Sequence, residues 1–314
     1  MRLKILNAKF LNLVNLISIK CQRYFFVPAN FFIYGGVLAT AAIWGGSFVV
    51  MKDALEKQDV YSFLATRFLI AALIMFMLRP RVFKGLTKIF VIRSVIAGCF
   101  LVGGYTFQTL GLKLTTVSNT GFITGLYLVF APLISWLILK RKFYKAHGLA
   151  VFCAALGLYL IAYNGISLGL GEILVLISAV LWGGHIVILS EWSDGKNNYA
   201  LTLIQILISA LILILLSLFN GFQAPPDASV WNAIFLTAIF ATVLAFFMQT
   251  KAQSVLSATA AAVLLAMEVP FALIFGLYFN DDPLTLRIGL GGSLIMVGMG
   301  LIIWWDNKSK NFSN

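Results

Sequence analysis

The chain has 314 residues, of which 61% are hydrophobic and only 11% are charged, and its mean hydropathy is +0.96. Soluble globular proteins carry about a quarter of their residues as charged side chains, so the composition excludes a soluble globular chain. The formal net charge of +12 comes from short basic clusters between apolar runs, where membrane proteins carry their orientation signals, so we expect no nucleic-acid partner.

The first element is a basic extension, residues 1–30. Its stretch MRLKILNAKFLNLVNLISIKCQRYFF holds five basic residues and no acidic one, with apolar side chains at helical spacing. Two interpretations stay open: an amphipathic helix lying on the anionic membrane surface, or a disordered extension. No cleavage site of small residues follows it, which disfavours a removable targeting segment.

From residue 31 onward the chain is a series of apolar runs, each near the length of about 20 residues that a transmembrane helix needs. The runs lack the two-residue alternation of a membrane β-barrel, and helices satisfy every backbone polar group within the span. We therefore predict an all-α integral membrane protein with ten transmembrane helices. The ten runs are 31–51, 60–78, 89–109, 117–139, 146–163, 170–190, 199–219, 230–249, 258–279 and 284–305.

Lysine and arginine set the predicted orientation. If the N-terminus is cytoplasmic, 18 basic residues lie on the inner side and 4 on the outer side, and Arg67 lies within a span. Because short cytoplasmic loops are enriched in lysine and arginine, we predict that both termini lie in the cytoplasm. The expected location is the inner (plasma) membrane, with the bilayer itself as a partner.

The apolar runs repeat at a constant offset. Trp44 and Trp182, in two Trp-Gly-Gly motifs, have the same separation along the chain as Pro132 and Pro270. We predict two five-helix repeats, 31–165 and 170–305, followed by a cytoplasmic tail, 306–314. Five spans per copy is an odd number, so the second copy enters the membrane from the opposite side. Inverted repeats are typical of secondary carriers, whose substrate site lies between the halves near the midplane.

Four stretches resemble the drug/metabolite transporter superfamily, in its ten-helix EamA family. They are AAIWGGSFVVMKDAL, ATRFLIAALI, TTVSNTGFITGLYLVFAPLIS and SATAAAVLLAMEVPFALIFG, and the likeness covers roughly residues 35–305. The resemblance implies two EamA repeats and a central cavity lined mainly by the first, third, fourth, sixth, eighth and ninth helices. It also implies export or exchange of small metabolites, often amino acids.

Glu268 is the most informative single residue. It lies near the centre of the ninth run, where an ionised carboxylate costs several kcal/mol unless it is paired or faces water. We predict that it binds substrate or couples transport to an ion, and protons are the candidate ion. The alternative is a neutral carboxyl that hydrogen-bonds between helices.

Two other polar residues lie inside apolar runs. Arg67 could bind a substrate carboxylate, or pair with an acidic group such as Glu268 to hold helices together. His185, which stands where the first repeat has Ser47, could carry a proton or act as a neutral hydrogen-bonding group.

The remaining predicted substrate residues are polar or aromatic side chains within the spans, which usually face protein or water rather than lipid. Helix packing would explain the same residue types. They are Trp44, Ser47, Gln108, Asn119, Tyr127, Trp182 and Gln249.

A second predicted set consists of small or helix-breaking residues. The glycines let helices approach closely, as static contacts or as sliding surfaces, and the prolines kink their spans. The set comprises Gly45, Gly46, Gly121, Gly125, Pro132, Gly183, Gly184 and Pro270.

These patterns predict a monomeric or homodimeric secondary transporter that exports or exchanges a small polar metabolite, such as an amino acid, by alternating access. Efflux of hydrophobic or cationic drugs and uptake of a cofactor-like metabolite are the alternatives. The stretch GISLG fits the GxSxG pattern, but it lies in a short turn between apolar runs without partner residues, so we expect no enzyme. The three cysteines have no metal-site or redox spacing, and we expect neither metal nor cofactor.

Overall fold

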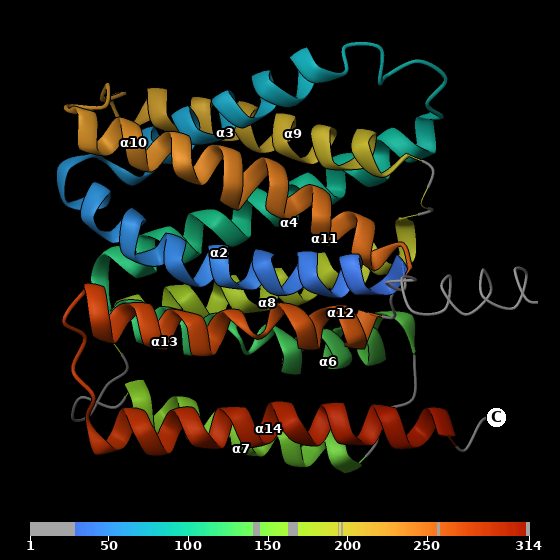
Figure 1. Ribbon diagram of the computed structural model, residues 1–314, viewed down its shortest axis with the longest axis vertical. Coiled ribbons are helices and arrows are strands. Elements are labelled where there is room, and N and C mark those ends of the chain that lie inside the picture. Colours follow the sequence, from blue (N-terminus) through green and yellow to red (C-terminus); the bar gives the residue numbers. More distant parts are fainter. Residues whose placement is uncertain are drawn as a thin grey trace, which may run out of the picture.

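The computed structural model describes residues 29–140, 145–162, 169–193, 195, 197–255 and 258–311. Throughout these residues the regular secondary structure is helical, without a strand (Figure 1). The predicted extension, residues 1–30, lies outside the described residues except for its last two, which begin the first helix.

The helices of the first half follow the predicted apolar runs, with one run divided in two. Asp59, Thr87 and Thr116 accept hydrogen bonds from backbone N–H groups in the first turns of the helices that follow them, as N-cap residues do. The helices are α2 (Ala29–Lys57), α3 (Val60–Leu78), α4 (Lys88–Leu114), α5 (Val117–Thr124), α6 (Tyr127–Leu139) and α7 (Lys145–Ala162).

The helices of the second half repeat this order. Its third run contains a π-helical segment, η1, and its fourth run is divided as in the first half. They are α8 (Leu170–Trp192), α9 (Asn198–Phe219), α10 (Ala228–Leu236), η1 (Thr237–Leu244), α11 (Ala245–Gln253), α12 (Ala258–Leu265), α13 (Glu268–Phe279) and α14 (Leu286–Asn311).

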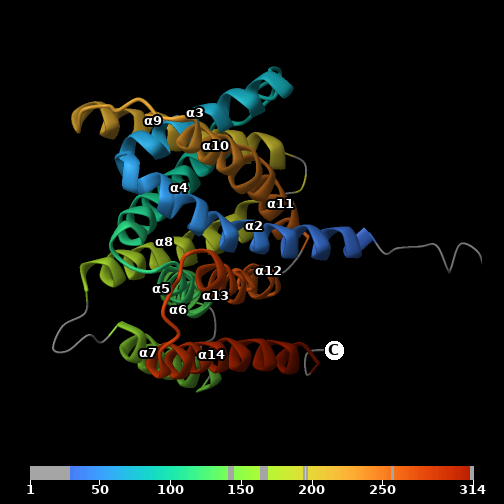
Figure 2. The same ribbon diagram turned by 60° about the vertical axis from the view of Figure 1, so that its left-hand side comes forward.

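Corresponding helices of the two halves occupy corresponding places in the bundle. In Figure 1 the pair α3 and α9 lies at one end of the stack, and the pair α7 and α14 lies at the other. Between them, α2 packs on α13 and α8 packs on α6, while α5 and α13 lie against each other (Figure 2). The duplicated sequence is therefore matched by a duplicated arrangement of helices, centred on the broken helices α5–α6 and α12–α13.

Membrane-spanning length is clear for most of the bundle. Seven helical stretches in the described part of the chain are long and apolar enough to cross a membrane. They are Gly35–Lys57, Val60–Leu78, Lys88–Leu114, Val117–Leu139, Leu170–Trp192, Asn198–Phe219 and Ala228–Gln253. The apolar stretches Gly148–Gly157, Glu268–Phe279 and Leu286–Gly298 are shorter, and two of them belong to the last two predicted spans.

The two prolines do not lie at the helix breaks themselves. The breaks fall at Gly125–Leu126 and Ala266–Met267, whereas Pro132 lies inside α6 and Pro270 lies in the first turn of α13. A proline ring clashes with the carbonyl four residues earlier, which for Pro270 is the carbonyl of Ala266. The disturbance therefore appears one turn before Pro270, and Gly125, at the break between α5 and α6, ends α5.

The glycines of the Trp-Gly-Gly motifs lie at helix crossings. A Cβ on Gly45 would come within 2.7 Å of the Phe271 Cβ and 2.8 Å of the Ala272 backbone nitrogen in α13. A Cβ on Gly183 would come within 2.9 Å of the Phe130 Cβ in α6. Three more of the predicted packing glycines face a neighbouring side chain: Phe275 for Gly46, Ala272 for Gly121 and Phe100 for Gly184.

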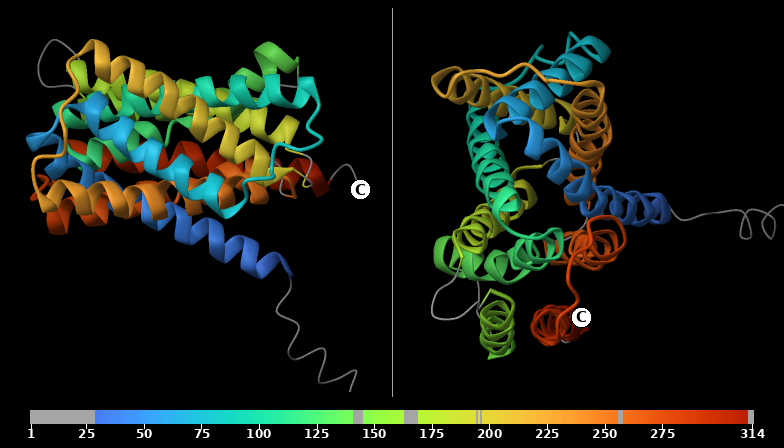
Figure 3. Two further views of the ribbon diagram at one scale, coloured as in Figure 1. Left: turned by 90° about the horizontal axis from the view of Figure 1, so that it is seen from above. Right: turned by 90° about the vertical axis from the view of Figure 1, so that its left-hand side faces the viewer.

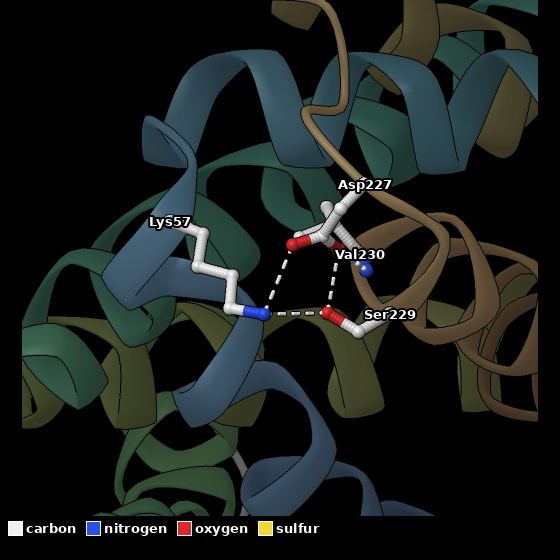
Figure 4. A network of polar contacts seen from close by, with 4 residues as sticks. All are labelled: Lys57, Asp227, Ser229 and Val230. Carbon is white, nitrogen blue, oxygen red and sulfur yellow. Dashed lines mark hydrogen bonds and ion pairs between the residues drawn. The ribbon is translucent and has the colours of Figure 1, made fainter.

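One ion pair ties the end of α2 to the start of α10 (Figure 4). Lys57 Nζ lies 3.0 Å from Asp227 Oδ2, and Asp227 Oδ1 accepts hydrogen bonds from Ser229 Oγ at 2.6 Å and from the Val230 N–H at 3.0 Å. Asp227 is thus both an ion-pair partner and the N-cap of α10. The Ser229 hydroxyl first, then the Val230 N–H and the Lys57 ammonium, hold the pKa of Asp227 below its usual range.

We expect Asp227→Ala to lower the thermal midpoint more than Lys57→Met does, because only the first removes the cap as well as the ion pair. The lowered pKa sets the sign of the pH dependence. The contribution of Asp227 to the free energy of unfolding is fully present at a pH above the ordinary pKa of an aspartate. It is lost as the pH falls toward the lowered pKa. Thermal unfolding of the three proteins at neutral and acidic pH measures both effects, and equal midpoints for the two variants would contradict the capping role.

Candidate functional site

A cavity lies between the two halves of the bundle. Its walls come from α2, α4, α5 and α6 of the first half and from α8, α11, α12 and α13 of the second. These helices correspond to the first, third, fourth, sixth, eighth and ninth predicted runs, the set that the family resemblance implied. The lining residues are Trp44, Ser47, Phe48, Met51, Tyr105, Gln108, Thr124, Tyr127, Trp182, Ile186, Gln249, Leu265 and Glu268.

The two broken helices bring their second segments to the cavity. Tyr127 is the first residue of α6 and Glu268 is the first residue of α13. The Tyr127 hydroxyl lies close to the Glu268 carboxyl. Neither Tyr127 Oη nor Glu268 Oε1 forms a hydrogen bond of regular geometry with another described residue. A helix N-terminus stabilises a negative charge, so the start of α13 suits a carboxyl group. Both breaks therefore place polar atoms at the boundary between the repeats.

Aromatic rings from both halves form one wall of the cavity. The Tyr105 ring lies edge-on to Trp182, with ring centroids 5.1 Å apart, and the Trp182 ring stacks on Phe246 at 6.1 Å. Trp44 packs against the same Phe246 ring at 5.3 Å. Such contacts fix the orientations of the rings that line the cavity.

The π-helical segment supplies a backbone acceptor behind this wall. The carbonyl oxygen of Ala241 accepts hydrogen bonds from Trp44 Nε1 at 2.9 Å, and from Tyr105 Oη and Arg67 NH2 at 3.4 Å each. Short π-helical segments inside α-helices frequently lie at functional sites. Side chains of α2, α3 and α4 thus converge on one carbonyl of η1.

Arg67 lies behind the cavity wall and not on its surface. Its side chain is fully buried, and it donates from Nε to Thr242 Oγ1 at 2.8 Å, from NH1 to Met51 Sδ at 3.2 Å and from NH2 to Tyr105 Oη at 3.0 Å. Its guanidinium carbon lies 4.7 Å from the centre of the Tyr105 ring. Within the described residues it forms no ion pair with Glu268, and both of its predicted roles stay predictions.

His185 is also buried behind the wall. Its Nε2 lies 2.7 Å from Gln205 Oε1, and Gln205 donates its amide nitrogen to the Leu201 carbonyl, so the histidine is the donor in this bond. Its ring packs edge-on against both Trp182 and Phe246. In the repeat, Gln205 is the counterpart of Arg67 and His185 is the counterpart of Ser47. Ser47 donates to the Trp44 carbonyl at 2.7 Å, so the His185–Gln205 hydrogen bond belongs to the second half.

Asn119 lies outside the cavity lining. It belongs to a polar cluster in which its amide donates to Glu172 Oε1 at 3.3 Å and to Thr115 Oγ1 at 3.2 Å. Gln108, by contrast, lines the cavity and donates to Thr124 Oγ1 at 3.0 Å.

The structure gathers seven of the ten predicted substrate residues around the cavity: Trp44, Ser47, Gln108, Tyr127, Trp182, Gln249 and Glu268. The apolar lining residues were not predicted. Some of them could have been found from the repeat, because its offset relates Phe48 to Ile186 and relates the predicted Tyr127 to Leu265. Their roles in binding stay predictions.

Known proteins resemble this chain over nearly its whole length. The family model described as the EamA-like transporter family matches residues 31–163 and again residues 169–304. An uncharacterized transporter of Archaeoglobus fulgidus is 34% identical over 269 residues, covering 85% of this chain and 84% of that protein. The uncharacterized transporter YoaV of Bacillus subtilis is 26% identical over 296 residues, covering 88% and 98%.

A solved crystal structure shares the arrangement of helices. It superposes with a TM-score of 0.64 and covers 87% of this chain and 96% of that one. The two sequences are 16% identical, so the likeness bears on the fold alone.

Proposed function

Because this chain belongs to the EamA-like transporter family and is a multi-pass membrane transporter, we propose that it is a secondary carrier of the inner (plasma) membrane. It exports or exchanges a small polar metabolite, such as an amino acid, by alternating access. Its two repeats, 31–165 and 170–305, span the membrane five times each in opposite senses, and both termini lie in the cytoplasm. Protons are the proposed coupling ion, and the carrier works as a monomer or homodimer.

One observation carries this proposal: the cavity lies at the boundary of the halves, and both halves line it. Inverted-repeat carriers bind substrate at this boundary, near the midplane and beside broken helices. The pairs α2–α13 and α6–α8 are related by the repeat. Each of these two equivalent interfaces contains one copy of the Trp-Gly-Gly motif, in α2 and in α8. Alternating access requires two such interfaces that open in turn.

A polar ligand suits the cavity better than a wholly apolar one. Four buried polar atoms of its lining have no hydrogen-bond partner within the described residues: Tyr127 Oη, Trp182 Nε1, Gln249 Oε1 and Glu268 Oε1. A buried polar atom without a partner costs about 1–3 kcal/mol, which a ligand with matching groups removes.

Counterflow in proteoliposomes tests the proposal. Vesicles loaded with a mixture of unlabelled amino acids are diluted into buffer that contains a trace of one labelled amino acid, with and without a pH gradient. With a carrier, the vesicles accumulate the label transiently, and the initial rate of uptake saturates as the outside concentration of the amino acid rises. Flux that neither saturates nor shows counterflow indicates a channel, and no flux for any of the common metabolites tested in turn would contradict the proposed function.

A further inference from the structure

A hollow lies beside the pair α3 and α9, which forms one end of the stack in Figure 1. It has a volume of about 290 Å³ and shares no lining residue with the cavity between the halves. The loop after α3 supplies one wall and the start of α9 supplies the other, so both repeats contribute. The lining residues are Arg79, Arg81, Val82, Asn197, Tyr199 and Ala200.

The two arginines of this hollow keep their N–H donors for a ligand. The Arg79 guanidinium carbon lies 5.6 Å from the centre of the Tyr199 ring, and Tyr199 Oη donates to the Met75 carbonyl of α3 at 2.7 Å. A guanidinium that lies over a ring keeps its donors at its edge. Within the described residues neither Arg79 nor Arg81 forms an ion pair, and neither side chain donates a hydrogen bond.

Successive turns position the two arginines. The Val82 N–H donates to the Arg79 carbonyl at 3.1 Å, and the Lys84 N–H donates to the Arg81 carbonyl at 3.2 Å. Gly85 then takes a φ of 77°, a left-handed conformation that favours glycine. A ligand therefore meets guanidinium groups on a loop whose backbone is already folded.

The second repeat has no arginine at the equivalent place. With the offset that relates the two Trp-Gly-Gly motifs, Arg79 and Arg81 correspond to Ser217 and Phe219. The hydroxyl oxygen of Ser217 lies 3.1 Å from that of Ser62, so the polar group there is satisfied by the protein itself. The repeat therefore accounts for the position of the hollow but not for its two arginines.

The sequence around the hollow is strongly basic. Residues 79–93 contain five lysines and arginines and no acidic residue, whereas the equivalent residues, 217–231, contain one aspartate and no basic residue. In the proposed orientation the basic loop lies on the cytoplasmic side. Anionic lipids give that leaflet its negative surface potential, and basic pockets between transmembrane helices on that side bind lipid headgroups.

Exposed apolar side chains lie next to the arginines along the chain. The last turn of α3 exposes Phe76, Met77 and Leu78. Phe83 of the loop is also exposed, and its ring stacks on Phe76 with centroids 6.2 Å apart. A phospholipid matches both parts of this surface, because it joins a phosphate to acyl chains, whereas a soluble phosphate matches the arginines alone.

We propose that this hollow binds the phosphate group of an anionic phospholipid from the cytoplasmic leaflet. Arg79 and Arg81 donate to the phosphate oxygens, in the paired geometry that guanidinium groups form with phosphate. The acyl chains lie along the last turn of α3 and Phe83. Because both repeats line the hollow, the bound lipid joins the cytoplasmic ends of α3 and α9. The inference goes beyond the proposed function and takes from it only the orientation in the membrane.

Native mass spectrometry of the full chain in detergent tests the inference, because it counts bound lipids without any transport assay. Dioleoyl phosphatidylglycerol and dioleoyl phosphatidylcholine have the same acyl chains and a phosphate, but only the first has a net negative charge. We expect the first molecule of phosphatidylglycerol to bind about tenfold more tightly than that of phosphatidylcholine, the usual effect of one hydrogen bond between charged groups.

Two double variants assign this difference to the hollow. Arg79→Gln/Arg81→Gln should abolish it. Lys84→Gln/Lys88→Gln removes the same charge from the same basic stretch, outside the lining, and should leave it unchanged. Arg81→Gln alone breaks no side-chain hydrogen bond or ion pair of the described fold, so it tests the site even if the double variant fails to fold. It should weaken phosphatidylglycerol binding about fivefold, the effect of one cationic side chain near the membrane surface.

Glycerol 3-phosphate distinguishes a lipid from a soluble phosphate. At the concentration at which phosphatidylglycerol fills the site, it should not displace the lipid, because it lacks acyl chains. Displacement at that concentration would assign the site to a soluble phosphate and overturn the inference. Equal binding of the two lipids, an equal loss in both double variants, or wild-type binding by Arg81→Gln would overturn it as well. None of these outcomes bears on counterflow, so the carrier is tested separately.

Discussion

Replacing Glu268 by glutamine should lower the initial rate of counterflow about tenfold or more, because a hydrogen bond to a charged group is worth about 1.5–3 kcal/mol. The substitution keeps the shape and the acceptor oxygen of the side chain and removes its ability to carry a negative charge. Glu268 lies at the start of α13 and beside Tyr127, on the surface shared by both repeats.

Initial rates over a range of pH measure this effect. The wild-type rate should change with pH, because the Glu268 carboxyl takes up and releases a proton in the proposed coupling, and the rate of the glutamine variant should not. Glu172→Gln serves as the matched control, because Glu172 is a buried carboxyl that lies with Thr115 and Asn119 away from the cavity. A Glu268→Gln variant with the rate and the pH response of the wild type would show that Glu268 takes no part in the transport mechanism.

Gly45→Ala should destabilise the bundle by about 1–3 kcal/mol, the usual cost of forcing a methyl group into a filled contact. The added Cβ would meet the Phe271 Cβ at 2.7 Å, the Ala272 nitrogen at 2.8 Å and the Glu268 carbonyl oxygen at 2.9 Å. Two of these atoms belong to the backbone of α13, so α2 and α13 have to separate. Because α13 begins with Glu268, the shift also displaces the cavity.

The same helix offers a matched control. The start of α2 projects from the bundle (Figure 3), and a Cβ on Gly35 would have nothing within 4 Å. Gly35→Ala should therefore be neutral or slightly stabilising, since alanine favours helix over glycine. Thermal unfolding followed by tryptophan fluorescence compares the two variants in one detergent. Equal midpoints would show that the α2–α13 crossing tolerates a methyl group.

The repeat and much of the cavity could be predicted from the sequence because both follow from local signals. Apolar runs and motifs that recur at one constant offset predict an all-helical membrane protein with matching halves. Trp44 and Trp182 are recognisable because large aromatic side chains beside glycine pairs recur at that offset. Glu268 is recognisable because a carboxyl inside an apolar run is costly.

Other features depend on long-range packing, which one sequence does not reveal. Nothing in the run TAIFATVL indicates a π-helix. In the fold, Trp44 of α2 and Tyr105 of α4 donate to the Ala241 carbonyl of this segment, and Arg67 of α3 donates to Thr242. Arg67 lies among apolar residues in the sequence, which do not indicate the direction of its side chain. In the fold its guanidinium donates to Met51 and Tyr105, and these two residues line the cavity. Asn119 belongs to the same polar stretch as residues of the lining, but α5 places its side chain beside Glu172.

The central claim is that the two halves cross the membrane in opposite senses, and one pair of lysines tests it directly. Lys113 and Lys251 are counterparts in the repeat, are both exposed and lie in the last turns of equivalent helices, α4 and α11. In a chain whose three cysteines are replaced by serine, Lys113→Cys and Lys251→Cys are each exposed to a membrane-impermeant maleimide. In intact cells only the cysteine at 113 should react, and the cysteine at 251 should react after the membrane is permeabilised. Labelling of both positions from the same side would contradict the inverted duplication and the carrier mechanism built on it.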